Sequence, residues 1–279
     1  ISGGISNTGK ISGTRAGIKL VNSDLYGGIN NSGTITSANT AIKLVGATLL
    51  GGINNSGLIS GNYGVYVDRS GTLDAINNSG SIDGTTSGVY VAGTVSGTYT
   101  GTFIGTYSGG TYIGTYTGLQ VGINNNGGSI TGRSYGIDLN NGQVPTGIRN
   151  EGWISGGLAG IALHNENASR AIYNGTLTGG ITNYGLITGN NGVAISLDSN
   201  STADIKNAAS GRIVGAINGN ADVTSSGLFA LQTISGGSIA TGSAVNSSIT
   251  GSYYQDAAGI LRIGVNGTSG TGTIGGHYS

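Results

Sequence analysis

Short runs of alternating apolar and polar residues recur along the whole chain, separated by glycine and asparagine. An Ile-x-Asn phrase begins at Ile5, Ile29, Ile53 and Ile76, so successive copies are 24, 24 and 23 residues apart. Later copies begin at Ile123, Ile148, Ile181 and Ile205. A second phrase of the form Gly/Ala-Ile/Val-x-Leu/Val lies inside the unit, as at residues 17–20, 41–44, 64–67 and 88–91. Alternation of period two that is rich in Ile and Val predicts β-strands, and no window shows a helical period.

The constant length of the unit predicts a solenoid. A unit of about 24 residues with three short strands and three turns cannot bury its apolar face alone, so consecutive units must stack. We therefore predict an all-β fold, a right-handed parallel β-helix with roughly 24-residue, three-strand coils. At a strand spacing of about 4.8 Å, nine or ten coils would make a rod about 45 Å long. Leucine-rich repeats are disfavoured because their asparagine-containing leucine consensus and helical half are both missing.

Three apolar columns should form the core of this solenoid. The first contains Ile5, Ile29, Ile53 and Ile76. The second contains Ile11, Ile35, Ile59 and Ile82. The third contains Ile18, Ile42, Val65 and Val89.

One asparagine follows the first isoleucine of each full repeat at a fixed distance of two residues. The set is Asn7, Asn31, Asn55, Asn78, Asn125, Asn150, Asn183 and Asn207. Asparagine tolerates a left-handed backbone at a turn, and inward amides can pass hydrogen bonds from coil to coil as a ladder. The alternative is that asparagine merely suits the turn. The strict register with isoleucine favours the ladder.

The interval between Ile76 and Ile123 is 47 residues, twice the usual spacing. The extra stretch is nearly mirror-symmetric about Gly109 and Gly110, which predicts a protruding β-hairpin at residues 98–118. A turn at these glycines would place Tyr107 opposite Tyr112 and Phe103 opposite Tyr116. A second, nine-residue excess between 164 and 173 should bulge from a turn. We divide the chain into β-helix repeats at 1–215, which carry the hairpin insertion, and irregular C-terminal coils at 216–279.

Tyrosine supplies the candidate contact surface. One outward column reads Lys19, Lys43, Tyr66, Tyr90, Asp138 and Ala162. Its tyrosines combine with the hairpin into a candidate adhesive patch suited to sugar rings or to another protein. The patch comprises Tyr66, Tyr90, Tyr99, Phe103, Tyr107, Tyr112 and Tyr116. The alternative is that the hairpin is a self-stabilising protrusion without a ligand.

Composition excludes several function classes. The chain has 279 residues with 58 Gly, no Cys, 11 basic and 11 acidic residues. Because its charges balance, binding to nucleic acid would gain nothing from the release of counterions. No His or Cys pair has zinc spacing, and we expect neither a metal nor a cofactor. Residues 132–136 match Gly-x-Ser-x-Gly, a weak motif in so glycine-rich a chain. His164, Glu166 and Asp138 are the remaining acid–base candidates. We expect His164 and Glu166 to lie in a solvated turn, and we expect the chain not to be an enzyme.

The repeated Gly-Gly-Ile-x-Asn-x-Gly-x-Ile-x-Gly, followed by Gly-Ile-x-Leu, resembles the passenger regions of type V secretion autotransporters, including self-associating adhesins. Residues 251–265 contain Tyr-x-Gln-x-x-x-Gly-x-Leu-x-Ile-x-Val, which is similar to a segment found late in such passengers. The resemblance implies a bacterial cell-surface or secreted location. The implied partners are other copies of the chain, or host and cell-surface glycans or proteins. Membrane attachment would be only through a barrel domain outside this sequence.

Three functions are consistent with the sequence. The first is an adhesive or self-associating structural shaft that mediates aggregation or biofilm formation. The second is a homopolymeric extracellular filament whose subunits stack through their solenoid ends, and the third is a glycan-degrading β-helix enzyme. Because Ile1 stands directly in repeat register and no secretion signal precedes it, we expect a fragment of a longer chain or ends that stack on neighbours.

Overall fold

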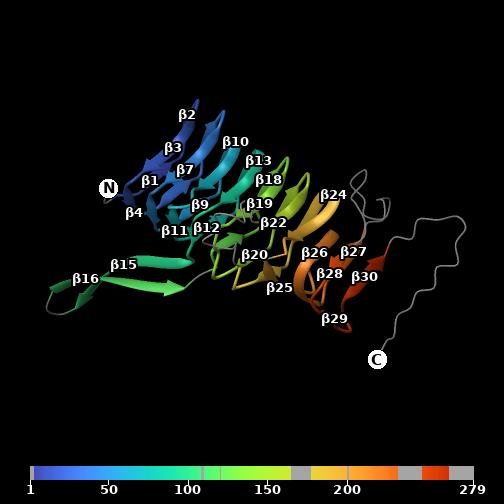
Figure 1. Cartoon of the computed structure of the whole chain (residues 1–279). Coiled ribbons are helices and arrows are strands. Elements are labelled where there is room, and N and C mark those ends of the chain that lie inside the picture. The colour runs from blue at the N-terminus through green and yellow to red at the C-terminus, as the bar shows by residue number, and fades with distance from the viewer. Residues whose placement is uncertain are drawn as a thin grey trace, which may run out of the picture.

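The chain folds as a parallel β-helix. The computed structural model describes residues 3–107, 110–119, 121–164, 177–199, 201–231 and 247–263. Apart from the two strands of the hairpin, each strand pairs in parallel with the equivalent strand of a neighbouring coil, and the coils follow one another from the N-terminal to the C-terminal end (Figure 1). The first four coils contribute strands to three faces, and the parallel β-helix predicted from the repeats is confirmed.

The first face contains the Ile-x-Asn phrases. Its strands are β1 (Ile5–Asn7), β5 (Ile29–Asn31), β9 (Ile53–Asn55), β12 (Ile76–Asn78), β17 (Ile123–Asn125), β20 (Ile148–Asn150), β23 (Ile181–Asn183), β25 (Thr202–Asn207) and β29 (Tyr253–Gln255). Isoleucine pairs with isoleucine and asparagine with asparagine at every step from β1 to β23. A three-residue strand is enough inside this face because each strand between β1 and β29 is hydrogen-bonded on both sides.

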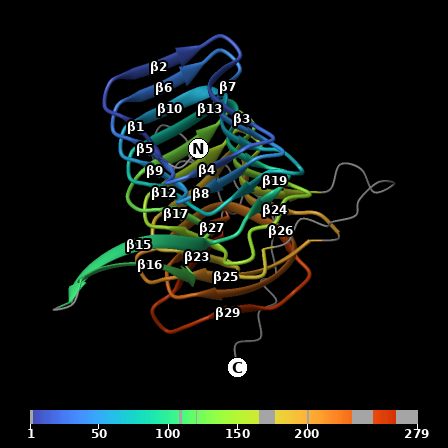
Figure 2. The same cartoon turned by 90° about the vertical axis from the view of Figure 1, so that its left-hand side faces the viewer.

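The second face is wider and bends in the middle. Its strands are β2 (Lys10–Gly13), β3 (Ala16–Val21), β6 (Thr34–Ser37), β7 (Thr40–Val45), β10 (Leu58–Val67), β13 (Ser81–Val91), β18 (Ser129–Gly132), β19 (Tyr135–Asn140), β21 (Trp153–Gly156), β22 (Ala159–His164), β24 (Leu186–Leu197), β27 (Leu228–Leu231), β28 (Ser248–Ile249) and β30 (Ile260–Ile263). Figure 2 shows β2, β6, β10 and β13 as successive rungs of this face. β10 and β13 run through the bend that separates β2 from β3 in the first coil.

The long strand β26 (Arg212–Ser225) belongs to both of these faces. It pairs with β24 on the second face and with β25 on the first. It runs without interruption across residues 215 and 216, where the sequence divides the chain into regular and irregular coils. Coil stacking continues beyond this point, because β27 pairs with β30.

The third face is the narrowest and closes the first coils. Its strands are β4 (Asp24–Tyr26), β8 (Thr48–Leu50), β11 (Thr72–Leu73) and β14 (Thr94–Val95). They pair in the order β4, β8, β11 and β14. Each places one apolar side chain inward, giving a fully buried column of Leu25, Leu49, Leu73 and Val95.

The core consists of apolar columns that run along the axis. The three predicted columns are present in register, the first on the first face and the other two on the second face. Their side chains are buried except at the first coil, where Ile5 and Ile11 are only partly covered. The leucine column of the third face is a fourth column that the sequence pattern did not predict. Stacking identical β-branched residues at one strand spacing buries apolar surface without gaps.

Glycine is required where the chain turns into the first face. Gly28 and Gly52, which precede Ile29 and Ile53, have positive φ values of 73° and 69°. A Cβ added at Gly52 would lie 2.6 Å from the carbonyl oxygen of Ala75 on the next coil. Positive φ and close coil-to-coil contact together explain the Gly-Gly pair that opens these repeats.

The hairpin protrudes from the stack between β14 and β17 (Figures 1 and 2). Its strands β15 (Thr98–Tyr107) and β16 (Gly110–Leu119) pair in antiparallel register. The predicted aromatic pairs are wrong, because Tyr107 lies opposite Gly110 and Tyr112 opposite Gly105. Phe103 likewise lies opposite Gly114, and Tyr116 opposite Gly101. The register is therefore shifted by two residues, and a glycine lies opposite each of these aromatic residues.

Candidate functional site

A cluster of three tyrosines lies on the outer side of the second face. Tyr66 of β10 pairs in register with Tyr90 of β13, and their rings stack at 4.7 Å between centroids with 6° between planes. Tyr63 of β10 contacts both rings edge to face, at 5.3 Å and 5.5 Å. Equivalent positions on neighbouring coils are one strand spacing apart, so their rings must stack. We call these three residues the tyrosine patch.

Lysine flanks the tyrosine patch on its N-terminal side. The Nζ atom of Lys43, the preceding residue of the same outward column, lies 5.0 Å from the centroid of the Tyr66 ring. This is a cation–π contact of a partly exposed pair. Burial, followed by the nearby Tyr63, raises the pKa of the Tyr66 hydroxyl. The phenol is therefore neutral at physiological pH and available as a hydrogen-bond donor.

The next coil continues the column with a carboxylate. Asp138 of β19 lies beside Tyr90 in the strand register and is only 4% exposed. Its Oδ1 atom is 3.3 Å from His164 Nε2, and its Oδ2 atom accepts a 3.4 Å hydrogen bond from the Ser87 hydroxyl. The His164 ring lies 5.4 Å from that of Tyr135. The solvated turn expected at His164 is therefore wrong, because His164 ends strand β22 and lies against a buried carboxylate.

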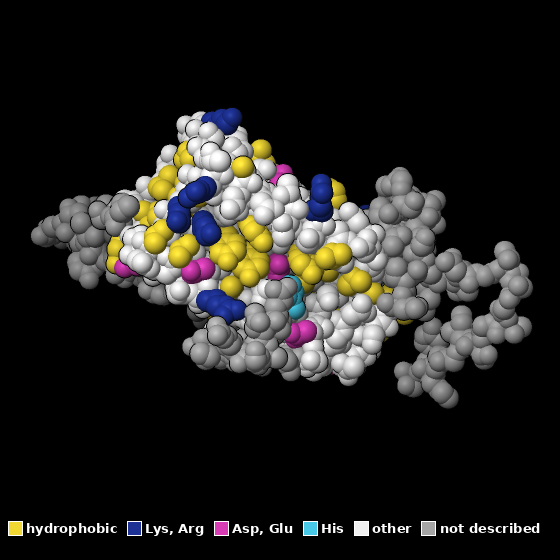
Figure 3. All heavy atoms as spheres, turned by 45° about the horizontal axis from the view of Figure 1, so that its top comes forward, with side chains coloured by type: hydrophobic (Ala, Val, Ile, Leu, Met, Phe, Trp, Pro, Cys, Tyr) yellow, Lys and Arg dark blue, Asp and Glu magenta, His cyan; other side chains and the backbone are white. Residues whose placement is uncertain are grey.

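Figure 3 shows one face of the molecule with the side chains coloured by type. A band of hydrophobic side chains crosses it, basic side chains lie along the part nearest the first coils, and the imidazole lies near the centre. Tyr63 contacts the two patch tyrosines and Tyr135 contacts His164, whereas the repeat pattern predicted only Tyr66 and Tyr90 on this outer side. Strict alternation along β10 would place Tyr63 on the inward side with Val65, whereas its ring contacts the two outward tyrosines.

The predicted asparagines form a continuous inward chain of amides. Seven side-chain hydrogen bonds of 2.7 to 2.9 Å link Asn7 through each successive member to Asn207. All eight residues are at most 7% exposed. Their backbones are not left-handed, contrary to the reasoning from turn propensity, because the described non-glycine residues with positive φ are Asn22 and Asn141. These asparagines end strands, and their role is to link the coils.

The other residues singled out in the sequence lie outside the tyrosine patch or outside the described residues. The Gly-x-Ser-x-Gly motif runs from the last residue of β18 into β19, so it joins two strands of one face and no helix follows it. Glu166 and the nine-residue excess after His164 lie outside the described residues. Tyr99, Phe103, Tyr107, Tyr112 and Tyr116 belong to β15 and β16, which are separate from the sheet that contains the tyrosine patch.

The described part of the chain contains neither a candidate metal cluster nor a helix that could span a membrane. Within it, no group of three or more His, Cys, Asp or Glu residues is arranged to hold a metal ion. The same residues include no helix long and apolar enough to cross a membrane. Comparison of the chain with protein-family models, with curated proteins and with solved structures gives no match.

Proposed function

We propose that the chain is the adhesive or self-associating shaft of a bacterial surface or secreted protein, and that it acts as a binding scaffold and not as an enzyme. The observation that carries this proposal is the tyrosine patch. Tyr63, Tyr66 and Tyr90 project from the outer side of the sheet, contribute nothing to the apolar columns, and are partly exposed. Tyrosine combines a large apolar ring with a hydrogen-bonding hydroxyl, which suits contact with sugars and with protein surfaces.

The scaffold supports this use because it is rigid. The coils that carry the tyrosine patch are fixed by backbone pairing on three faces and by the asparagine ladder inside. A ring stacked on its neighbour in the next coil is already ordered before a partner arrives. Little side-chain entropy is then lost on binding, which favours affinity.

The experiment compares cells that display the chain with cells that display a Tyr66→Thr/Tyr90→Thr variant. Threonine keeps the β-propensity of the strands and removes both rings. We expect aggregation of the cells, or their adhesion to immobilised glycans, to be lost. Lys19→Thr, a change in the same outward column beyond Lys43, is the matched control and should behave as wild type.

Other outcomes would point to the alternatives. Undiminished aggregation by a folded double variant would contradict the proposal. Filaments of the purified chain in electron microscopy would favour end-to-end stacking, and turnover of a surface polysaccharide would favour the enzyme.

A further inference from the structure

A second surface, on the first face, has a different chemistry. The residue between each isoleucine and its ladder asparagine points outward, and in four successive coils it is an asparagine: Asn30, Asn54, Asn77 and Asn124. Beside this column run the serines that follow the ladder residues, Ser32, Ser56 and Ser79. Together they line a hollow of about 410 Å³, which we call the asparagine groove.

The groove is neutral and rich in paired donors and acceptors. All of its lining side chains are asparagine or serine. Asn54 donates to Asn30 at 3.0 Å and Asn77 donates to Asn54 at 3.1 Å, so an outer chain of amides parallels the buried ladder. Each amide has two donor hydrogens and two acceptor sites, and one bond along the chain leaves others free to face the groove.

This outer chain of amides is incomplete at Asn124. The Oδ1 atom of Asn124 is buried and accepts no hydrogen bond. An unsatisfied amide oxygen is unfavourable, and rotation of the side chain toward the groove would let a ligand hydroxyl donate to it. A ligand that carries hydroxyl groups therefore gains a contact that the chain alone does not make.

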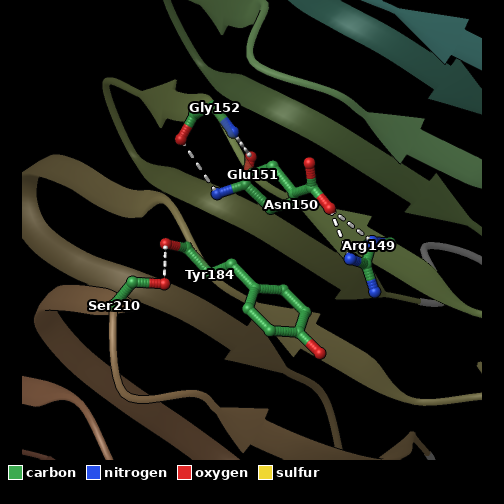
Figure 4. Close-up of polar contacts among 6 residues, drawn as sticks. All are labelled: Arg149, Asn150, Glu151, Gly152, Tyr184 and Ser210. Carbon is green, nitrogen blue, oxygen red and sulfur yellow. Dashed lines mark hydrogen bonds and ion pairs between the residues drawn. The ribbon is translucent and has the colours of Figure 1, made fainter.

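The groove ends where the chemistry of both columns changes. The asparagine column continues with Arg149, and the serine column continues with Asn126, Glu151 and then Tyr184. The Arg149 guanidinium donates to Glu151 and lies 4.4 Å from the centroid of the Tyr184 ring (Figure 4). Glu151 raises the pKa of Arg149, so this cation is permanent. The neutral groove therefore covers the coils from Ser6 to Asn126 and stops at a charged, aromatic boundary.

We propose that the asparagine groove binds an extended, uncharged polysaccharide that lies along the shaft. Sugar hydroxyls both donate and accept, as the amides do. The coil spacing of about 4.8 Å is close to the length of one pyranose unit, so successive units meet successive coils. An anionic polymer is disfavoured because no cation lines the groove. An added peptide strand is disfavoured because the strands of this face already pair on both sides.

The test measures binding of linear β-1,4-linked glucose oligomers, from disaccharide to hexasaccharide, to the purified chain by calorimetry. We expect affinity to rise with length and level off near about five units, one per coil of the groove. Asn54→Val/Asn77→Val should lower the affinity about tenfold or more, because valine fits the strand but offers no hydrogen bond. The matched control is Lys206→Thr, in the same outward column beyond the groove, and it should bind as wild type.

Three results would overturn the proposal: no binding of any neutral oligomer by the wild-type chain, equal binding by a folded groove variant, or tighter binding of oligogalacturonate of the same length. A monomer–dimer equilibrium that the groove variant abolishes in sedimentation would assign the groove to a second copy instead. This site does not depend on the tyrosine patch. Tyr66→Thr/Tyr90→Thr should leave oligomer binding unchanged, so failure of one proposal is distinguishable from failure of the other.

Discussion

Asn55 donates a 2.8 Å amide hydrogen bond to Asn78, the equivalent residue of the next coil, although the two are 23 positions apart in the chain. The same Nδ2 atom also lies 3.1 Å from the carbonyl oxygen of Gly57 and 3.0 Å from that of Ser81. One buried amide thus ties its own coil to the following one. In a solenoid, where each repeat contacts only its neighbours, such links hold consecutive coils in register.

Replacing Asn55 with alanine should therefore destabilise the solenoid. We expect a loss of roughly 1–3 kcal/mol, because buried carbonyl groups lose their donor. Its neighbour Asn54 is the same residue type but faces solvent, and Asn54→Ala should change stability by less than about 0.5 kcal/mol. Denaturant unfolding of both variants is the measurement. Equal effects at the two positions would contradict a stabilising role for the inward ladder.

Gly52 offers a test of the turn that leads into the first face. Gly52→Ala forces a side chain onto a backbone with φ of 69° and brings a Cβ to 2.6 Å from the Ala75 carbonyl oxygen. The conformational cost alone is about 1–2 kcal/mol, and the clash adds to it. At Gly9 an added Cβ meets nothing within 4 Å, so Gly9→Ala is the control and should be nearly neutral. Thermal unfolding that ranks the two variants alike would count against a strained turn.

The repeat was enough to predict the coil register, because isoleucine and asparagine recur at fixed positions. Both point into the solenoid, where isoleucine forms the apolar columns and asparagine forms the ladder. The same pattern did not reveal the third face. Its strands, such as Thr72–Leu73, are too short to show alternation, and only the coil-to-coil recurrence of Leu49 and Leu73 could have indicated a buried column.

The hairpin register was missed for a different reason. Glycine and aromatic residues alternate on both strands. A shift of the pairing by two residues keeps all of them on the same face, so the local pattern fits both registers equally well. The tyrosine patch was found only in part. Tyr66 and Tyr90 follow from the repeat, whereas Tyr63 precedes Tyr66 by three positions, and alternation assigns it to the other side.

Stability at high pH should report on Tyr66. Burial raises its pKa above the ordinary value of 10.0, so the folded chain holds the phenolic proton more tightly than the unfolded chain does. This contribution to stability is complete below pH 10.0 and is lost as the pH rises through the folded-state pKa. Tyr66→Phe should therefore flatten the fall in unfolding midpoint above that pH. Because the pKa of Tyr253 is also raised, Tyr253→Phe is the comparison that separates the two contributions. An alkaline profile unchanged in Tyr66→Phe would contradict the assignment.

The hairpin should be dispensable for folding. Ile76 of β12 pairs directly with Ile123 of β17, and Ile82 pairs with Ile130, so the coils on either side of the insertion stack as if it were absent. β15 and β16 form a sheet of their own. Deleting residues 98–118 and closing the gap with a short Gly/Ser turn should preserve the circular dichroism spectrum of the solenoid. Loss of the folded spectrum would mean that the hairpin contributes to coil stacking.

The same deletion separates the two groups of aromatic residues in the predicted adhesive patch. It removes Phe103 and the hairpin tyrosines but leaves Tyr63, Tyr66 and Tyr90 in place. If the hairpin makes the contact, cells that display the folded deletion variant should lose aggregation or adhesion, because buried aromatic rings dominate such interfaces. Added salt should have little effect on the wild type, since no charged residue lies between 98 and 118. Aggregation that survives the deletion but is lost in Tyr66→Thr/Tyr90→Thr would assign the contact to the tyrosine patch alone and leave the hairpin a self-stabilising protrusion.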